Sequence, residues 1–169
     1  MKTFVPLKEV DSVYAILAQI SIFGGTTDIQ RKEIFRRLET GTFEKGEYIF
    51  QKGDEPSHIY IVKNGSIDLL ITDGEVIIQK KELGVGECFG EASLMSMHTH
   101  TASAIATTQT EIIVLSRHAL NLLRHEDPPL FSLLLINIAR ELARRLKITD
   151  DILLHYLHTH KAVADQNQF

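Results

Sequence analysis

The sequence predicts a mainly β fold with flanking helices, and three observations support this fold class. Between residues 42 and 115, short apolar runs alternate with glycine-containing turns at about ten-residue spacing, which is typical of a β sandwich or barrel. Before this region apolar residues recur at helical spacing, and after it a long stretch lacks glycine and proline. The 169 residues, 44% of them apolar, are enough for one globular domain with a helical extension.

Residues 1–41 form the predicted N-terminal helical segment. Apolar residues between positions 8 and 20 repeat at helical spacing, which indicates a first helix. Thr27 and Gln30 have the spacing of a capping box, in which the two side chains satisfy free backbone donors at a helix start. We expect the second helix to end at Gly41, since glycine is the preferred residue just after a helix.

Residues 42–115 form the predicted β-roll. The sequences Asn64-Gly65 and Asp73-Gly74 suit the positive φ angles of tight hairpin turns. Short β-type runs lie on either side of these and other turns. The runs are Tyr48–Phe50, Ile59–Val62, Ile67–Ile71, Val76–Ile78 and Ile112–Leu115.

Residues 116–160 form the predicted C-terminal helices. Ser116 is placed to cap one helix, and Asp127 with Pro128 to start another, because proline at the first helical position loses no hydrogen bond. No glycine or proline follows Pro129, which predicts one long helix. The tail at 161–169 is expected to be disordered.

The long helix carries a heptad repeat that predicts a homodimer. Two sets of positions recur every seven residues, four residues apart, and six of the seven are apolar. They are Leu135, Leu142, Thr149 and Tyr156, and Ala139, Leu146 and Leu153. Such a seam is expected to pair with a second copy. The alternative is that the helix packs on the β-roll of its own chain, which accounts better for the first half of the seam than for the second.

The composition disfavours nucleic acid and membrane partners. There are 18 basic and 22 acidic residues, a net charge of −4, which gives no electrostatic attraction to phosphate backbones. The N-terminus lacks the apolar run of a signal peptide, and no apolar stretch approaches the ~18 residues of a membrane span. The single cysteine, Cys88, excludes an intramolecular disulfide. We therefore expect a cytoplasmic protein.

No catalytic or metal-binding residues are predicted. His98 and His100 lie two positions apart and His155, His158 and His160 cluster near the C-terminus, but no cysteine or carboxylate set accompanies them. No serine lies in a GxSxG motif, and the sequence has no glycine-rich loop of the kind that binds nucleoside triphosphates. We expect a protein that is not an enzyme and that has no metal or cofactor.

Two motifs resemble the cyclic-nucleotide-binding domain. The first runs from Gly53 to Gly65, and the second, called the cassette below, occupies residues 89–102. The cassette keeps the Phe-Gly-Glu start of the family pattern and its Thr-Ala end, but Thr99 and His100 stand where the family has Pro and Arg. The resemblance extends from about Ile22 to Leu157. It implies an antiparallel double-stranded β-helix, or jelly roll, of about eight strands, with N-terminal helices and a long C-terminal dimerisation helix.

The resemblance also implies a ligand, cAMP or cGMP, and a set of binding residues. These are Phe89, Gly90, Glu91, Ala92, Ser93, His100, Thr101, Ala102 and Thr149. Gly90 would let the backbone approach the ligand, Glu91 would accept a hydrogen bond from the ribose 2′-hydroxyl, and Thr101 would reach a phosphate oxygen. The last helix is similar to the dimerisation helix of bacterial catabolite activator proteins, where a Thr matching Thr149 approaches the adenine. Those activators continue into a helix-turn-helix domain, and we expect this chain to lack it.

His100 separates two interpretations of function. Arginine offers a phosphate two charged hydrogen bonds from a rigid fork, whereas a histidine with a pKa of ~6.5 is mostly neutral at pH 7. If each charged bond is worth ~1.5–3 kcal/mol, binding weakens roughly ten- to several-thousand-fold. One interpretation is a sensor with weak or retuned nucleotide binding that signals through its C-terminal helices to a protein effector. The alternative is a degenerate, nucleotide-independent interaction or dimerisation module.

Overall fold

The computed structural model describes residues 2–8, 10–73 and 76–166, and it confirms the jelly-roll fold with flanking helices. All strand pairs are antiparallel, and the strands form two sheets with the orders β1-β2-β9-β4-β7 and β3-β8-β5-β6. The strands are β1 (Val5–Pro6), β2 (Leu38–Phe43), β3 (Tyr48–Phe50), β4 (His58–Asn64), β5 (Ile67–Asp73), β6 (Val76–Leu83), β7 (Cys88–Phe89), β8 (Ser103–Ala106) and β9 (Thr110–Ser116). The helices are α1 (Val10–Gln19), the 3₁₀ turn η1 (Ser21–Phe23), α2 (Asp28–Phe35), α3 (Glu91–Ser96), α4 (Arg117–Glu126) and α5 (Pro128–Gln166).

Two neighbouring strands of the larger sheet, β4 and β9, are buried on both faces, which explains their unbroken apolar runs. In β4, Ile59 and Ile61 pack in the core beneath the helices, whereas Tyr60 and Val62 pack inside the roll. The same alternation holds along β9. A strand covered on both sides needs apolar residues at every position, because successive side chains point to opposite faces. The two central strands therefore join a helical layer to the β-roll.

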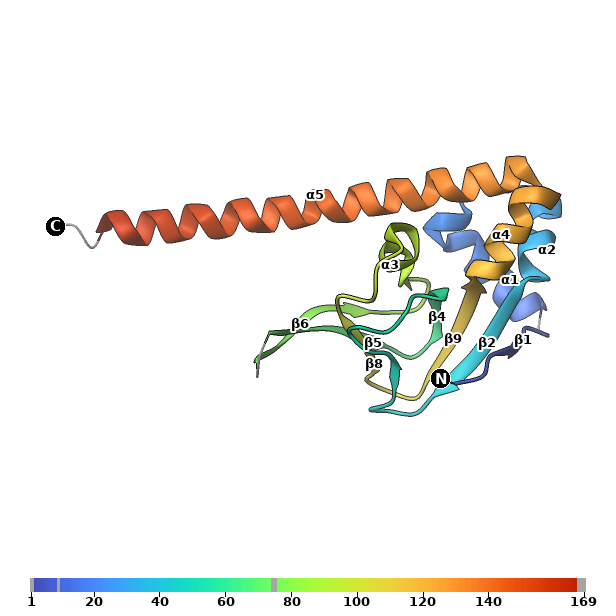
Figure 1. Cartoon of the computed structure of the whole chain (residues 1–169), viewed down its shortest axis with the longest axis horizontal. Coiled ribbons are helices and arrows are strands. Elements are labelled where there is room, and N and C mark those ends of the chain that lie inside the picture. The colour runs from blue at the N-terminus through green and yellow to red at the C-terminus, as the bar shows by residue number, and fades with distance from the viewer. Residues whose placement is uncertain (1, 9, 74–75, 167–169) are drawn as a thin grey trace.

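The helices α1, α2 and α4 gather at one end of the β-roll, and α5 runs from them over α3 and the roll and beyond the roll (Figure 1). Leu130, Leu134 and Ile138 of α5 are buried against this end. The buried Asn137 side chain donates to the carbonyls of Ile22 and Gly24 at 3.2 and 2.7 Å. These contacts fix the first half of α5 to the N-terminal turn η1.

The predicted helix starts are confirmed. Thr27 and Gln30 form the full capping box of α2, and the Ser116 hydroxyl accepts the Ala119 N–H at the start of α4. Asp127 Oδ1 accepts the Leu130 N–H at 3.0 Å at the start of α5. Short-range polar contacts of this kind are encoded within four residues, so the sequence alone predicts them.

The predicted end of the second helix at Gly41 is wrong. The helix ends at Phe35, and Gly41 lies within β2, which pairs with β9 along its whole length. Strand structure thus begins at Leu38 rather than at residue 42. A Cβ atom at Gly41 would lie 2.8 Å from the Phe4 ring, so the glycine allows the N-terminal segment to pack across β2. The segment 1–41 also contains the short strand β1 and is not purely helical.

The C-terminal boundary also differs from the prediction. The helix α5 continues to Gln166, so most of the expected disordered tail at 161–169 is helical, and residues 167–169 lie outside the described residues. None of the helices in the described chain is long and apolar enough to cross a membrane. A cytoplasmic location stays a prediction of the sequence.

Substitutions at two glycines with the same φ angle can test how tightly the β-roll is packed. Gly46 and Gly65 both have φ of +87°, but a Cβ at Gly65 would lie 2.6 Å from the Gln109 carbonyl oxygen, whereas nothing lies within 4 Å at Gly46. We expect Gly46→Ala to lose about 1 kcal/mol of unfolding free energy from backbone strain. Gly65→Ala should lose roughly 1–3 kcal/mol more from the steric clash. Urea unfolding of both variants measures the difference, and equal losses would contradict this packing.

Candidate functional site

The cassette begins where β7 turns into α3, and only glycine fits at this turn. Gly90 has φ of 82°, and a Cβ atom there would lie 2.7 Å from the Tyr60 ring. The side chain of Phe89 before it points into the β-roll, and Glu91 after it is the first residue of α3. The turn therefore places the Glu91 carboxylate at the mouth of the roll, beneath α5.

Glu91 is only 1% exposed and pairs with a cation from α5. Its Oε1 atom accepts a hydrogen bond from Arg145 Nη1 at 2.5 Å. Arg145 also donates from Nη2 to the Cys88 carbonyl and from Nε to Glu141 Oε1 at 3.2 Å. Burial raises the pKa of Glu91, and the attraction of Arg145 offsets this only in part. The pair thus joins the cassette to α5, with the Glu91 carboxylate buried and Arg145 partly exposed.

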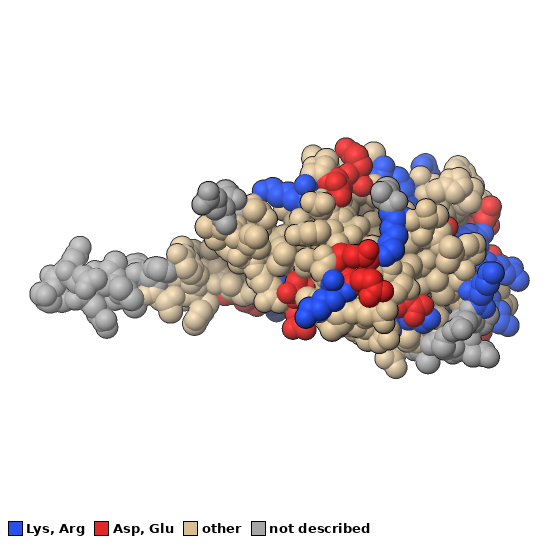
Figure 2. Space-filling model, turned by 90° about the horizontal axis from the view of Figure 1, so that it is seen from below, with Lys and Arg blue, Asp and Glu red and all other residues tan. Residues whose placement is uncertain are grey.

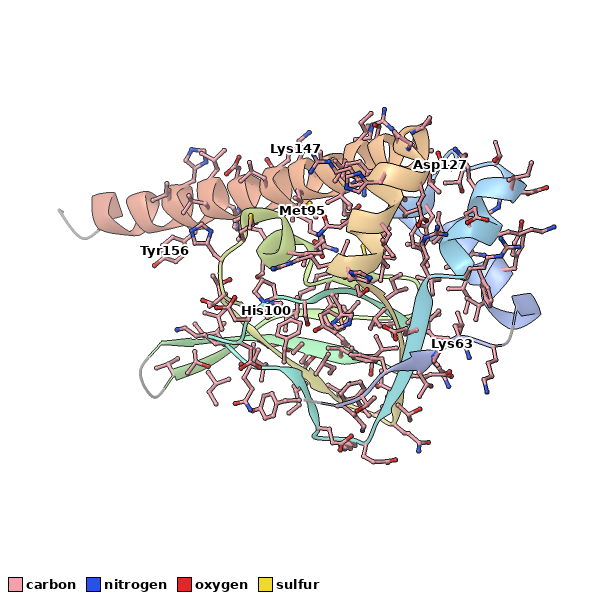
Figure 3. All side chains as sticks on the ribbon, turned by 45° about the vertical axis from the view of Figure 1, so that its right-hand side comes forward. Lys63, Met95, His100, Asp127, Lys147 and Tyr156 are labelled. Carbon is pink, nitrogen blue, oxygen red and sulfur yellow. The ribbon has the colours of Figure 1, made fainter. Side chains whose placement is uncertain are left out.

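His100 lies in the wall of the cassette, stacked on an aromatic ring. Its ring centroid is 3.7 Å from that of Phe50, with an interplanar angle of 8°. Its backbone N–H donates to the Asp54 carbonyl at 2.9 Å, and its carbonyl accepts the Gly53 N–H at 2.8 Å. Figure 3 shows His100 between α3 and the strands of the roll. Burial lowers the pKa of His100, and the nearby Asp54 carboxylate opposes this shift. The imidazole is therefore neutral at pH 7.

Eight of the nine predicted binding residues line one cavity of about 90 Å³, together with Phe50, Leu69 and Arg145. The eight are Phe89, Gly90, Glu91, Ala92, Ser93, His100, Thr101 and Ala102. Thr149 does not line it: its side chain is exposed on α5, and its hydroxyl donates to the Arg145 carbonyl at 3.0 Å. Whether these residues bind a ligand stays a prediction.

Arg145 is the principal residue that the sequence prediction missed. It lies four residues before Thr149, so the two share one face of α5. The predicted position of Thr149 on a ligand-facing helix surface was therefore a usable signal for Arg145. Phe50 and Leu69 carry no such signal, since they reach the cavity from strands distant in sequence.

Two polar atoms in this cavity have no hydrogen-bond partner. Among the described side chains that are buried, they are Glu91 Oε2 and His100 Nε2. Leaving a buried polar group unpaired costs about 1–3 kcal/mol. A larger hollow of about 550 Å³ lies near Tyr48 and Asp54, but neither unpartnered atom belongs to its lining. The small cavity is thus the better candidate for a binding site, because polar atoms there require partners.

The chain is similar in sequence to known proteins. A model of the family described as the cyclic nucleotide-binding domain matches residues 40–127. The cAMP-dependent protein kinase regulatory subunit of Eremothecium gossypii is 33% identical over 84 residues, which cover 50% of this chain and 18% of that subunit. The chain thus spans less than a fifth of that relative's length.

Solved structures show the same fold. The catabolite activator protein of Thermus thermophilus superposes with a TM-score of 0.71 at 31% identity, covering 79% of this chain and 61% of that one. A cyclic nucleotide-binding domain from Methylobacillus flagellatus gives a TM-score of 0.78 at 22% identity, covering 89% and 88% of the two chains. The family match covers more than half of the sequence, includes the whole cassette, and agrees with the jelly-roll fold. This chain therefore belongs to the cyclic nucleotide-binding domain family.

Proposed function

We propose that this chain is a regulatory, non-catalytic module that binds a cyclic nucleotide or related small ligand at Glu91 and responds through α5. The ion pair between Glu91 and Arg145 carries this proposal. The resemblance to the family assigns Glu91 to a ribose hydroxyl, whereas here its Oε1 atom is bonded to α5. A ligand and the helix therefore compete for one carboxylate. Competition of this kind gives the ligand a differential affinity for two positions of α5, which is what a conformational response requires.

The size of the cavity supports this competition. Its volume of about 90 Å³ is small beside the ~300–1,000 Å³ of pockets that enclose such ligands. Arg145 is the lining residue contributed by α5, and its side chain occupies the side of the cavity next to Glu91. A nucleotide would gain room most directly by displacing Arg145. Binding would then loosen the link between the cassette and α5.

The charges around the cavity indicate weak binding of cAMP or cGMP at neutral pH. A cyclic phosphate carries one negative charge and needs a fixed cation. His100 is neutral, and Arg145 is already engaged by Glu91 and Glu141. A phosphate would favour the protonated form of His100, so we expect cyclic nucleotide affinity to increase as the pH falls.

The projecting half of α5 would transmit the response to ligand binding through its contacts with other proteins. Beyond Arg145, six aliphatic residues of this helix are each more than half exposed. They are Leu146, Ile148, Ile152, Leu153, Leu154 and Leu157. On the face in Figure 2, acidic and basic residues are interspersed over the body, whereas the projecting end is mostly uncharged where it is described. Leu146 and Leu153 of this set belong to the heptad seam, and an exposed apolar seam is suited to a second copy of the chain, so that the paired helices would contact a protein effector.

The second candidate is a ligand-independent interaction module. The observation that favours it is the aromatic stack of His100 on Phe50, which fills the position of the family arginine with a neutral ring. Under this alternative, Glu91 and Arg145 only fasten α5. Restoring the cation at position 100 separates the two candidates.

The variant His100→Arg should bind cAMP more tightly. One charged hydrogen bond of ~1.5–3 kcal/mol corresponds to a gain of roughly 10- to 150-fold. Isothermal titration calorimetry at pH 7.5 measures this gain. His98→Arg is the matched control. His98 is exposed and lies two residues before His100, so an arginine there adds the same charge outside the cavity. Equal affinities of the two variants, or no binding by His100→Arg, would favour the ligand-independent module.

Removing Arg145 should make stability depend strongly on pH. Because the pKa of Glu91 is raised in the folded state, ionising this carboxyl destabilises the fold, and stability falls as the pH rises through that pKa. Without Arg145 the pKa rises further. We expect Arg145→Met to lose on the order of 3 kcal/mol at pH 8 and less at pH 5. Urea unfolding at both pH values provides the measurement.

Two further variants test whether the unpaired Glu91 charge causes the loss of stability at pH 8. Adding Glu91→Gln to Arg145→Met removes the buried charge and should restore most of the stability at pH 8. Arg144→Met is the control, since Arg144 forms a more exposed pair with Glu141 worth ~0–1 kcal/mol. If Arg145→Met and Arg144→Met are equally stable at both pH values, the buried pair does not hold α5 in place.

The heptad seam predicts a dimer in solution that one charge disrupts. Leu153→Glu puts a carboxylate into the paired surface, so we expect the dimer to dissociate at least about tenfold more readily, a change of ~1.4 kcal/mol. Sedimentation equilibrium over a concentration series measures the dissociation constant. His158→Glu is the control, because His158 lies on the opposite face of the same helix. A monomeric native chain at every concentration would exclude this dimer.

A further inference from the structure

Two buried polar atoms in the lining of the cavity at Glu91 are available for hydrogen bonds to a ligand. Glu91 Oε2 and His100 Nε2 both lack a partner among the described residues, and the two side chains are 1% and 3% exposed. An ionised carboxylate oxygen only accepts hydrogen bonds, whereas a neutral imidazole nitrogen either donates or accepts. An occupant must therefore donate one hydrogen bond to Glu91 and exchange another with His100.

While Arg145 keeps its contacts, the described lining of the cavity has no free cation for an anion. Arg145 is the cationic side chain in the lining, and it is bonded to Glu91, Glu141 and the Cys88 carbonyl. The charged groups that face His100 are Asp54, Glu91 and Arg145, and none of them brings an unpaired positive charge. A bound phosphate would thus lie beside the Glu91 carboxylate without a free counter-charge. Burial makes this repulsion stronger than it is in water.

We propose that the preferred ligand is an uncharged molecule with neighbouring hydroxyl groups, of the nucleoside type, rather than a cyclic nucleotide anion. This inference rests on the proposed function, because it assumes a small ligand at this cavity and specifies its chemical class. One ligand hydroxyl donates to Glu91 Oε2, and the other pairs with His100 Nε2. A sugar hydroxyl both donates and accepts, so it satisfies both atoms without adding charge.

The shape of the site favours a nucleoside over a free sugar. The cavity of about 90 Å³ admits only the hydroxyl-bearing end of a larger molecule. Phe50 is a buried apolar wall covered by His100. Leu69 is partly exposed, and Thr149 is exposed one helical turn beyond Arg145 on the same side of α5. A flat base outside the cavity can pack along this surface. A free sugar would leave it uncovered.

Calorimetry with the whole chain at pH 8, where His100 is neutral, tests the proposal. The probes are adenosine, guanosine, their 3′,5′-cyclic monophosphates and ribose. We expect each nucleoside to bind at least about tenfold more tightly than its cyclic monophosphate, and ribose to bind more weakly than either nucleoside. The order should reverse in His100→Arg and not in His98→Arg. Glu91→Gln should lose nucleoside binding.

Each contrary result points to a different failure. Tighter binding of the cyclic monophosphates by the native chain at pH 8 overturns the uncharged ligand but leaves the proposed sensor intact. Ribose binding as tightly as the nucleosides overturns the nucleoside class. If no probe binds either the native chain or His100→Arg, both the ligand class and the proposed function are wrong.

Discussion

A carboxylate that is 1% exposed requires a cation, and in this protein the cation comes from the far end of the chain. Gly90 turns the backbone so that Glu91 lies under α5, and Arg145 is 54 residues away in sequence. Burial makes the pair sensitive to its surroundings, because a charge left unpaired in a dry environment destabilises the fold strongly. The position of α5 over the cassette and the ionisation of Glu91 are therefore linked. Anything that takes Glu91 from Arg145 also acts on the helix.

The sequence predicts the parts of this arrangement that depend on neighbouring residues. The unbroken apolar runs at 59–62 and 112–115 indicate strands because β4 and β9 are covered on both faces. Helix caps at Thr27, Ser116 and Asp127 are local and were found. The strands β1, β2, β7 and β8 were missed because their pairing partners lie far along the chain and their own residues are small, few or polar.

At the site, too, the sequence predicts what depends on neighbouring residues and misses what depends on distant contacts. The cassette residues lie close together in sequence, so a motif identifies them as a group. Arg145 and Phe50 enter the cavity only because α5 crosses the roll and β3 closes it. Their contacts depend on the tertiary path of the chain, which no local pattern encodes. Thr149 was expected at the ligand and instead lies outside the cavity, since α5 brings Arg145 to Glu91 at this point.

Packing and charge are connected at His100. Stacking on Phe50 buries the imidazole, and burial favours its neutral form, so the contact that holds the loop in place also removes the positive charge. An arginine at this position would keep its charge when buried, because its pKa is far above neutrality. Under our proposal, a histidine in place of the arginine would change the class of ligand that the cavity can stabilise, while the backbone of His100 keeps its hydrogen bonds to Gly53 and Asp54.

The response of α5 would be confined to its outer half. Asn137 and the apolar residues of α5 up to Leu142 hold the first half independently of the cassette, so losing the Arg145 contacts would free the helix only beyond about Leu142. That half carries the exposed heptad seam. If a second copy pairs along the seam, dimerisation and ligand binding both change the position of one helix segment. By thermodynamic linkage, each must then alter the affinity of the other by the same factor. The Glu91 to Arg145 pair would thus set the strength of the coupling between ligand binding and dimerisation. The arrangement of the seam would decide whether ligand binding favours or opposes the dimer.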